Sequence, residues 1–159
     1  MKKTLASAAT AVLLAIALAS IAFAAPAAGI QLLFKGTLQA QETVIDPGPP
    51  TRLHAIGSGN ATQLGQYTIA YDPVVDPTFH ATTSGTFVAA NGDSLTYEGT
   101  GQATAAGEPG GFDIVEELTI TGGTGRFAGA TGSFTIQRHL NVITLVTSGT
   151  FEGTILLAH

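Results

Sequence analysis

The chain has 159 residues, enough for one domain, and its 6 Lys+Arg against 11 Asp+Glu give a formal net charge of −5. This acidic balance argues against nucleic acid or an anionic membrane as a partner, and the absence of cysteine excludes disulfides, thiol catalysis and Cys-based metal sites. A content of 20 glycines with only 11% charged residues is typical of a sheet protein rich in turns.

The N-terminal residues have the features of a signal peptide. Two lysines precede an uncharged apolar run over residues 5–23, and Ala22-Phe23-Ala24 is an A-x-A cleavage site. We predict a helical signal peptide over residues 1–24, with cleavage after Ala24, and hence a secreted or periplasmic protein. A membrane anchor is the alternative, but the small residues at the end of the run favour cleavage, which leaves no stable membrane anchor.

The remaining chain alternates apolar and polar residues in short segments that turn residues separate. A flexible lead over residues 25–31 precedes a single domain over residues 32–159. Proline-rich segments at residues 45–50 and 72–77 are predicted to be loops. The predicted strands cover residues 33–44, 52–59, 64–71, 80–89, 93–104, 112–121, 132–140 and 143–157.

About eight strands joined by short turns, with no amphipathic helix, predict an all-β fold. Small all-β domains protect their edge strands by closing a barrel or by pairing two sheets. We therefore predict an eight-stranded antiparallel β-barrel, with a β-sandwich as the alternative. A barrel of this size has an interior that side chains can fill or that can hold one small ligand.

An Asn-Gly pair at Gly92 predicts a hairpin between residues 80–89 and 93–104. A two-residue loop would place Phe87 opposite Thr96. A three-residue loop with a left-handed Gly92 places Phe87 opposite Tyr97 and keeps apolar residues on one face, so we prefer it. Phe87 and Tyr97 are then candidates for lining a ligand-binding interior.

A glycine-rich turn separates the strands predicted at residues 112–121 and 132–140. Its structural glycines are Gly122, Gly123, Gly125 and Gly129, which we expect to provide positive φ angles or close strand approach. Residues 123–128 also fit the dinucleotide pattern G-x-G-x-x-A. That pattern requires a following helix, and the periodicity here predicts a strand instead.

The same turn, Gly122-Gly123-Thr124-Gly125-Arg126-Phe127-Ala128-Gly129-Ala130-Thr131-Gly132, resembles the late-barrel turn of allene oxide cyclase and dirigent-type proteins. An earlier stretch, Gly57-Ser58-Gly59 followed by Leu64-Gly65-Gln66, is similar to a second glycine pattern there. The resemblance implies an eight-stranded antiparallel barrel with a hydrophobic cavity, often assembled as a homotrimer. The turn is structural in that superfamily and does not by itself transfer an activity.

Two charges break the apolar pattern of the strands beside this turn. Glu116 shares a face with Phe112, Ile114, Leu118 and Ile120, and Arg138 shares a face with Phe134, Ile136 and Leu140. A hairpin centred on Phe127 places Glu116 directly opposite Arg138, within ion-pair reach. We hypothesise an inward-facing pair that is either structural or a polar anchor for a ligand; a different register would place both charges in water.

No catalytic residue, metal site or cofactor is predicted. The histidines His54, His80, His139 and His159 lack metal-ligand spacing, and no serine lies in a G-x-S-x-G elbow. The prediction is a secreted non-enzymatic barrel that binds a small apolar ligand or acts as an interaction module. The alternative is a cyclase-like isomerase acting inside the barrel. The predicted ligand-binding residues are Glu116, Arg138, Tyr97 and Phe87.

Overall fold

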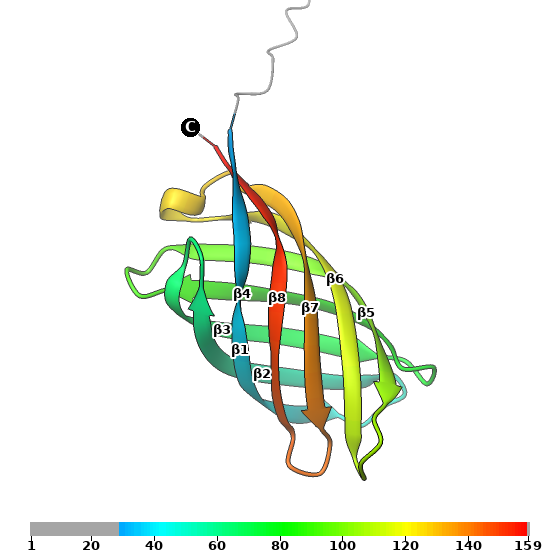
Figure 1. The fold of residues 1–159 in the computed structure, drawn as a ribbon. Coiled ribbons are helices and arrows are strands. Elements are labelled where there is room, and N and C mark those ends of the chain that lie inside the picture. Colours follow the sequence, from blue (N-terminus) through cyan, green and yellow to red (C-terminus); the bar gives the residue numbers. More distant parts are fainter. Residues whose placement is uncertain (1–28, 159) are drawn as a thin grey trace, which may run out of the picture.

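The computed structural model describes residues 29–158 as one closed eight-stranded antiparallel β-barrel (Figure 1). Each strand pairs with the next along the chain, and the last pairs with the first. The predicted barrel is confirmed, and the sandwich alternative is wrong because no sheet edge remains open. The strands are β1 (Ile30–Asp46), β2 (Thr51–Ala61), β3 (Gly65–Val75), β4 (His80–Ala89), β5 (Ser94–Ala105), β6 (Gly111–Gly123), β7 (Thr131–Asn141) and β8 (Val146–Leu157), with a 3₁₀ turn η1 (Gly125–Phe127).

The predicted signal peptide and its cleavage site after Ala24 lie outside the described residues. Within residues 29–158, no helix is long and apolar enough to cross a membrane.

The apolar residues of each alternating segment face the inside of the barrel and the polar residues face the outside, because successive side chains of a strand point to opposite faces. In β6, Ile114, Glu116, Leu118 and Ile120 are buried, whereas the residues that alternate with them are exposed. Only β4 has the predicted bounds, and the largest differences are at one end of each of three strands. β1 starts at Ile30 rather than residue 33, β8 starts at Val146 rather than residue 143, and β3 continues through Pro73 to Val75.

The continuation of β3 corrects the predicted loop at residues 72–77. Proline removes a backbone donor, so it is tolerated in a strand where the ladder does not use that donor. The pairing between β2 and β3 is interrupted between Arg52–Val74 and Ala55–Tyr71, which leaves Pro73 opposite no hydrogen-bonded partner on that side. On its other side β3 keeps its register, and Pro73 lies across from Thr83.

In each of the two hairpins whose preferred register was predicted, the observed pairing differs from the prediction by two residues, although the predicted inward and outward faces are correct. Phe87 pairs with Leu95, and Tyr97 pairs with Gly85, because the three-residue loop covers residues 90–92 and is closed by a hydrogen bond from the Ala89 N–H to the Asp93 carbonyl. The left-handed conformation predicted for Gly92 is confirmed by its φ of +88°. Phe87 and Tyr97 still face inward, and their ring centroids are 5.2 Å apart.

In the second hairpin, Arg138 lies opposite Ile114 and Glu116 lies opposite Ile136. The register shifts because the connection between β6 and β7 is centred on Arg126 rather than Phe127. Phe127 instead points inward and is fully buried. An even shift leaves every side chain on its predicted face, so Glu116 and Arg138 remain inside the barrel.

The predicted structural role of the turn glycines fits their backbone angles. The φ angles of Gly122, Gly125 and Gly129 are +143°, +57° and +71°. Gly123 lacks a positive φ but approaches the Ser94 carbonyl so closely that a Cβ would clash with it. At Gly125, a Cβ would collide with the Asp93 carboxylate, so both the conformation and the available space require glycine there.

Aromatic side chains fill the end of the barrel that carries η1 in Figure 1. Phe34, Phe87, Phe134 and Phe151 contact one another, with the Phe34 and Phe134 rings edge to face at 5.2 Å. Phe127, from η1, belongs to the same buried cluster. This half of the barrel is a packed aromatic core.

Replacing Gly125 with valine should destabilise the protein by about 1–3 kcal/mol, because a β-branched residue at this positive φ is strained and contacts Asp93. Urea denaturation measures the effect. Gly107→Val is the matched control, since no atom lies within 4 Å of the position its Cβ would take. Equal stability of the two variants would contradict the assigned role of Gly125.

Candidate ligand-binding site

The opposite half of the barrel contains an internal cavity of about 360 Å³ that opens at the end where the β7–β8 and β5–β6 turns lie. Seven of the eight strands contribute to its wall. The lining is apolar except for Thr51 near the mouth and two charged residues, Glu42 and Arg138. The residues are Glu42, Val44, Thr51, Leu53, Pro73, Val75, Phe79, Ala81, Ala103, Phe112, Ile114, Arg138, Leu140, Val142 and Leu145.

The cavity exists because the inward-facing residues are small on one side of this half of the barrel. β4 places Ala81 there, and β5 places Ala103. The next two strands, β6 and β7, carry larger side chains such as Ile114 and Leu140. In the aromatic half of the barrel, which we call the sealed half, the inward-facing positions of β4 and β5 hold Phe87 and Tyr97, whose rings fill the interior.

The floor of the cavity is a buried ion cluster around Arg138. The Arg138 Nη1 donates to Glu42 Oε1 at 2.7 Å, and its Nε donates to Glu116 Oε2 at 2.9 Å. A second contact, from Nη2 to Glu116 Oε1, is 3.4 Å long. The side chains of all three residues are at most 3% exposed, so the charges interact away from bulk water.

Two hydroxyl groups complete the floor. Tyr71 donates to Glu42 Oε1 at 3.2 Å, and Thr147 accepts from Arg138 Nη1 at 3.2 Å while donating to the His139 carbonyl at 3.0 Å. The Arg138 guanidinium also lies over the Tyr71 ring, 5.5 Å from its centroid. These contacts satisfy most of the polar atoms that the cluster buries.

The cluster also shifts the ionisation of its members. Burial raises the pKa of Tyr71 well above its ordinary value, so this hydroxyl stays protonated and remains a donor. For Arg138, burial lowers the pKa, but the neighbouring Glu116 carboxylate and the other groups of the floor raise it by more. Arg138 is therefore a permanent cation in this site.

The structure brings Glu116 and Arg138 together, as predicted, but as diagonal rather than directly opposite neighbours. Space for Glu116 comes from Gly101, whose Cβ would meet the Glu116 side chain. Phe87 and Tyr97 lie in the sealed half, and neither is part of the cavity lining within residues 29–158. For these four residues, ligand binding stays a prediction.

Glu42 is the functional candidate that the sequence reasoning missed. It follows Phe34, Leu38 and Ala40 on the inward face of β1, so it breaks an apolar stripe in the same way as Glu116 and Arg138. The alternation of inward and outward positions along β1 was enough to identify it from the sequence. Its pairing with Arg138 could not be found from hairpins, because β8 lies between β1 and β7.

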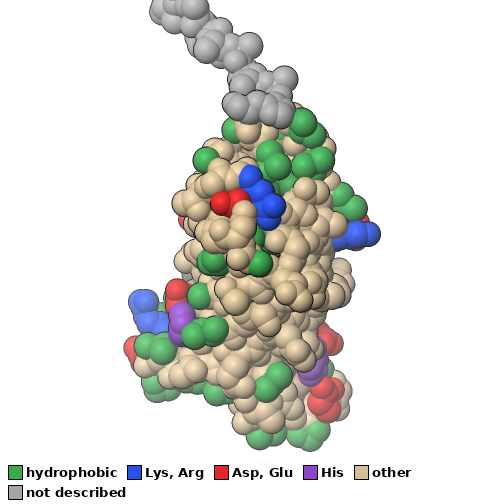
Figure 2. Space-filling view, turned by 90° about the vertical axis from the view of Figure 1, so that its left-hand side faces the viewer, with side chains coloured by type: hydrophobic (Ala, Val, Ile, Leu, Met, Phe, Trp, Pro, Cys, Tyr) green, Lys and Arg blue, Asp and Glu red, His purple; other side chains and the backbone are tan. Residues whose placement is uncertain are grey.

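The mouth of the cavity is apolar at its edge. Among the described residues, Ile45, Phe79 and Ile143 are 64%, 50% and 73% exposed there. Figure 2 shows hydrophobic side chains at the lower end of the molecule, whereas the wall above them is mostly uncharged and polar. An apolar molecule therefore meets apolar surface before it enters the cavity.

One titratable cluster lies close to the mouth, on the outside of the barrel. His139 Nδ1 is 3.0 Å from Asp113 Oδ1, and its Nε2 is 2.7 Å from Glu108 Oε1. The hydrogen bond with Asp113, together with Glu108, raises the pKa of His139. Within residues 29–158, no group of three His or acidic side chains is arranged to hold a metal ion.

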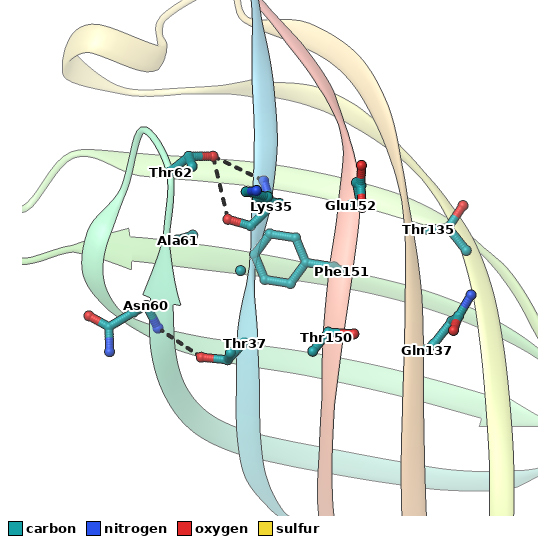
Figure 3. Close-up of a pocket in the computed structure, with 11 residues that line it drawn as sticks. Lys35, Thr37, Asn60, Ala61, Thr62, Thr135, Gln137, Thr150, Phe151 and Glu152 are labelled. Carbon is teal, nitrogen blue, oxygen red and sulfur yellow. Dashed lines mark hydrogen bonds between the residues drawn. The ribbon is translucent and has the colours of Figure 1, made fainter.

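A second hollow, of about 540 Å³, lies on the outer wall where β1, β2, β7 and β8 adjoin (Figure 3). Two backbone amides along it are bonded to threonine hydroxyls: Lys35 N–H donates to Thr62 Oγ1 at 3.0 Å, and Asn60 N–H reaches Thr37 Oγ1 at 3.5 Å. It holds no buried charge and is open along its length. The interior cavity is therefore the candidate site.

Comparison with known proteins supports the fold. The sequence matches no protein-family model and no curated protein. The solved structure of the pterocarpan synthase dirigent protein PsPTS1 is similar, with a TM-score of 0.59, 11% identity, and coverage of 82% of this chain and 97% of that chain. For the pterocarpan synthase dirigent protein GePTS1 the values are 0.55, 11%, 84% and 93%. The chain thus has a dirigent-like barrel fold, as the glycine motif indicated.

Replacing Arg138 with methionine should cost about 3–5 kcal/mol, because two buried carboxylates lose their cation. The triple variant Glu42→Leu, Glu116→Leu, Arg138→Met should cost far less, since no buried charge remains. Urea denaturation measures both. Arg52→Met, at an exposed position of β2, should change the free energy of unfolding by no more than about 0.5 kcal/mol. An Arg138→Met variant as stable as the wild type would contradict the cluster.

His139 should titrate above its ordinary pKa of about 6.5, because both ring nitrogens face carboxylates. Protonated His139 then stabilises the folded state fully below pH 6.5, and this contribution is lost as the pH rises through the higher folded-state pKa. NMR titration measures it. Asp113→Asn should lower the His139 pKa, while Glu117→Gln, on the exposed face of β6, should leave it unchanged. An unshifted His139 in the wild type would contradict these contacts.

Proposed function

We propose that this protein is a non-enzymatic barrel that binds one small, largely apolar molecule in the cavity above Arg138. The observation that carries the proposal is the difference between the two halves of the same barrel. One half is packed shut by aromatic rings, and the other keeps a cavity of about 360 Å³ with an apolar wall and a polar floor. Ligand sites in proteins have this combination of apolar walls and few polar groups.

The size of the cavity limits the ligand. It holds about 12 water molecules at their liquid volume of roughly 30 Å³ each. A ligand with a similar number of non-hydrogen atoms would fill it. The volume lies near the lower end of the usual range for small-molecule sites, so the proposed ligand is a small molecule rather than a long lipid or a peptide.

A cyclase-like activity is the second candidate. The observation that favours it is the floor, where the Glu42 carboxylate and the Tyr71 hydroxyl lie in contact beside the cavity. Groups held this rigidly could orient a reactive molecule, and catalysis would then consist mostly of positioning. The two similar structures are named as pterocarpan synthase dirigent proteins. Recovery of a bound ligand in chemically unchanged form, by mass spectrometry, favours binding alone.

The proposed setting is outside the cytoplasm, on the basis of the signal peptide in the sequence. We also propose a homotrimer, which the low charge of the outer wall supports because an uncharged surface costs less to bury between subunits than a charged one. Neither proposal is needed for a single barrel to bind its ligand.

Replacing Ala103 with phenylalanine should lower the affinity for a neutral apolar probe, N-phenyl-1-naphthylamine, by about 10-fold or more, equivalent to about 1.4 kcal/mol. The new ring would occupy the cavity, which Ala103 lines. Probe fluorescence measures binding, and thermal melting confirms that each variant is folded.

Thr100→Phe is the matched control, because Thr100 is exposed on the outer face of the same strand. It should bind the probe as the wild type does. Equal binding by the two phenylalanine variants, or no binding by the wild type, would contradict the proposed site.

A further inference from the structure

We propose that the cavity selects neutral molecules that carry a hydroxyl group, and that it discriminates against the corresponding carboxylic acids. This inference rests on the proposed function and specifies the ligand class for the same site. The inference follows from the hydrogen-bond donors and acceptors of Glu42 and Arg138 that have no partner in the floor of the cavity.

Glu42 supplies the free acceptor. Its Oε1 already accepts hydrogen bonds from Arg138 Nη1 at 2.7 Å and from the Tyr71 hydroxyl at 3.2 Å. Its Oε2 accepts none from residues 29–158, and Glu42 lines the cavity. A carboxylate oxygen in so apolar a place gains most from a ligand group that donates a hydrogen bond.

Arg138 supplies one free donor. A guanidinium has five N–H groups, and four of them point at partners: Nε and one N–H of Nη2 at Glu116, and the two of Nη1 at Glu42 and Thr147. The remaining N–H of Nη2 has no partner within the described part of the chain. Arg138, like Glu42, lines the cavity.

The floor therefore offers one acceptor, on Glu42, and one donor, on Arg138, from two residues that line the same cavity. A hydroxyl group matches this arrangement, because its hydrogen can go to Glu42 Oε2 while its oxygen accepts from Arg138. The carbon skeleton would then lie along the apolar wall formed by Val44, Ile114 and Leu140.

An anionic ligand would fit poorly, although an arginine faces the cavity. Glu42 and Glu116 together outnumber the single positive charge of Arg138, so a third carboxylate would be buried beside two others. Charges interact strongly in a low-dielectric interior, and an uncompensated buried charge is costly. The excess negative charge attracts an alkylammonium, but an ammonium loses its hydration on burial and has no lone pair to accept a hydrogen bond from Arg138, so it should also bind more weakly than the alcohol.

The test compares three ligands of equal chain length, 1-octanol, octanoate and octylammonium, by isothermal titration calorimetry at pH 7.5. We expect 1-octanol to bind at least about 10-fold more tightly than either ion. Octanoate or octylammonium binding as tightly as the alcohol would overturn the inference and leave the proposed function standing. No binding by any of the three would overturn the proposed function, and the inference with it.

Two matched variants then locate the selectivity. Glu42→Gln removes a carboxylate that lines the cavity, whereas Glu117→Gln removes one from the exposed face of β6. We expect Glu42→Gln to lower the affinity for 1-octanol by about 10-fold and Glu117→Gln to leave it within about threefold of the wild type. Equal affinities of the two variants for 1-octanol would overturn the role assigned to Glu42. Should Glu42→Gln fail to fold, the comparison of the three ligands on the wild type still decides the proposal.

Discussion

The buried guanidinium of Arg138 organises the interior of this barrel. It reaches Glu116 on the neighbouring β6, Thr147 on β8, and Glu42 on β1 beyond β8. Tyr71, on β3, joins from the other side of the lumen. A strand pairing one residue out of register would turn these groups outward, so the cluster and the closed barrel depend on each other.

Such a cluster contributes little net stability compared with apolar residues of the same size, because desolvation opposes the attraction between the charges. A packed apolar layer would serve the fold equally well, and the aromatic half of the barrel shows that this chain can form one. The cluster lies where that packing stops and the cavity begins. Its position therefore favours a role toward the cavity rather than in stability alone.

Much of the fold follows from alternation along single strands. The parity of β6 and β7 placed Glu116 and Arg138 inside the barrel before their partners were known. Register was predicted less well, because it depends on where each turn is centred. The first hairpin turns at residues 90–92, and the second is centred on Arg126, and each position shifts the pairing by two residues from the prediction. Since both shifts are even, the faces are right while the partners are wrong.

The cavity itself could not be predicted from the pattern. Whether a barrel interior is filled depends on how side chains from different strands share the lumen, and local sequence carries no record of those neighbours. Ala81 and Ala103 read as ordinary apolar positions of β4 and β5. They border a cavity only because closure of the barrel brings the distant strands that carry Glu42 and Arg138 to the same interior space.

Methyl-resolved NMR during a titration with 1-octanol tests the central claim most directly, because it reports on both halves of the barrel at once. The account predicts shifts at Ala81, Ala103, Ile114 and Leu140, which lie around the cavity, and unchanged signals at Ile69, Leu95 and Ile155 in the sealed half. Shifts confined to the sealed half or to the outer wall, or no shifts at saturating ligand, would contradict it.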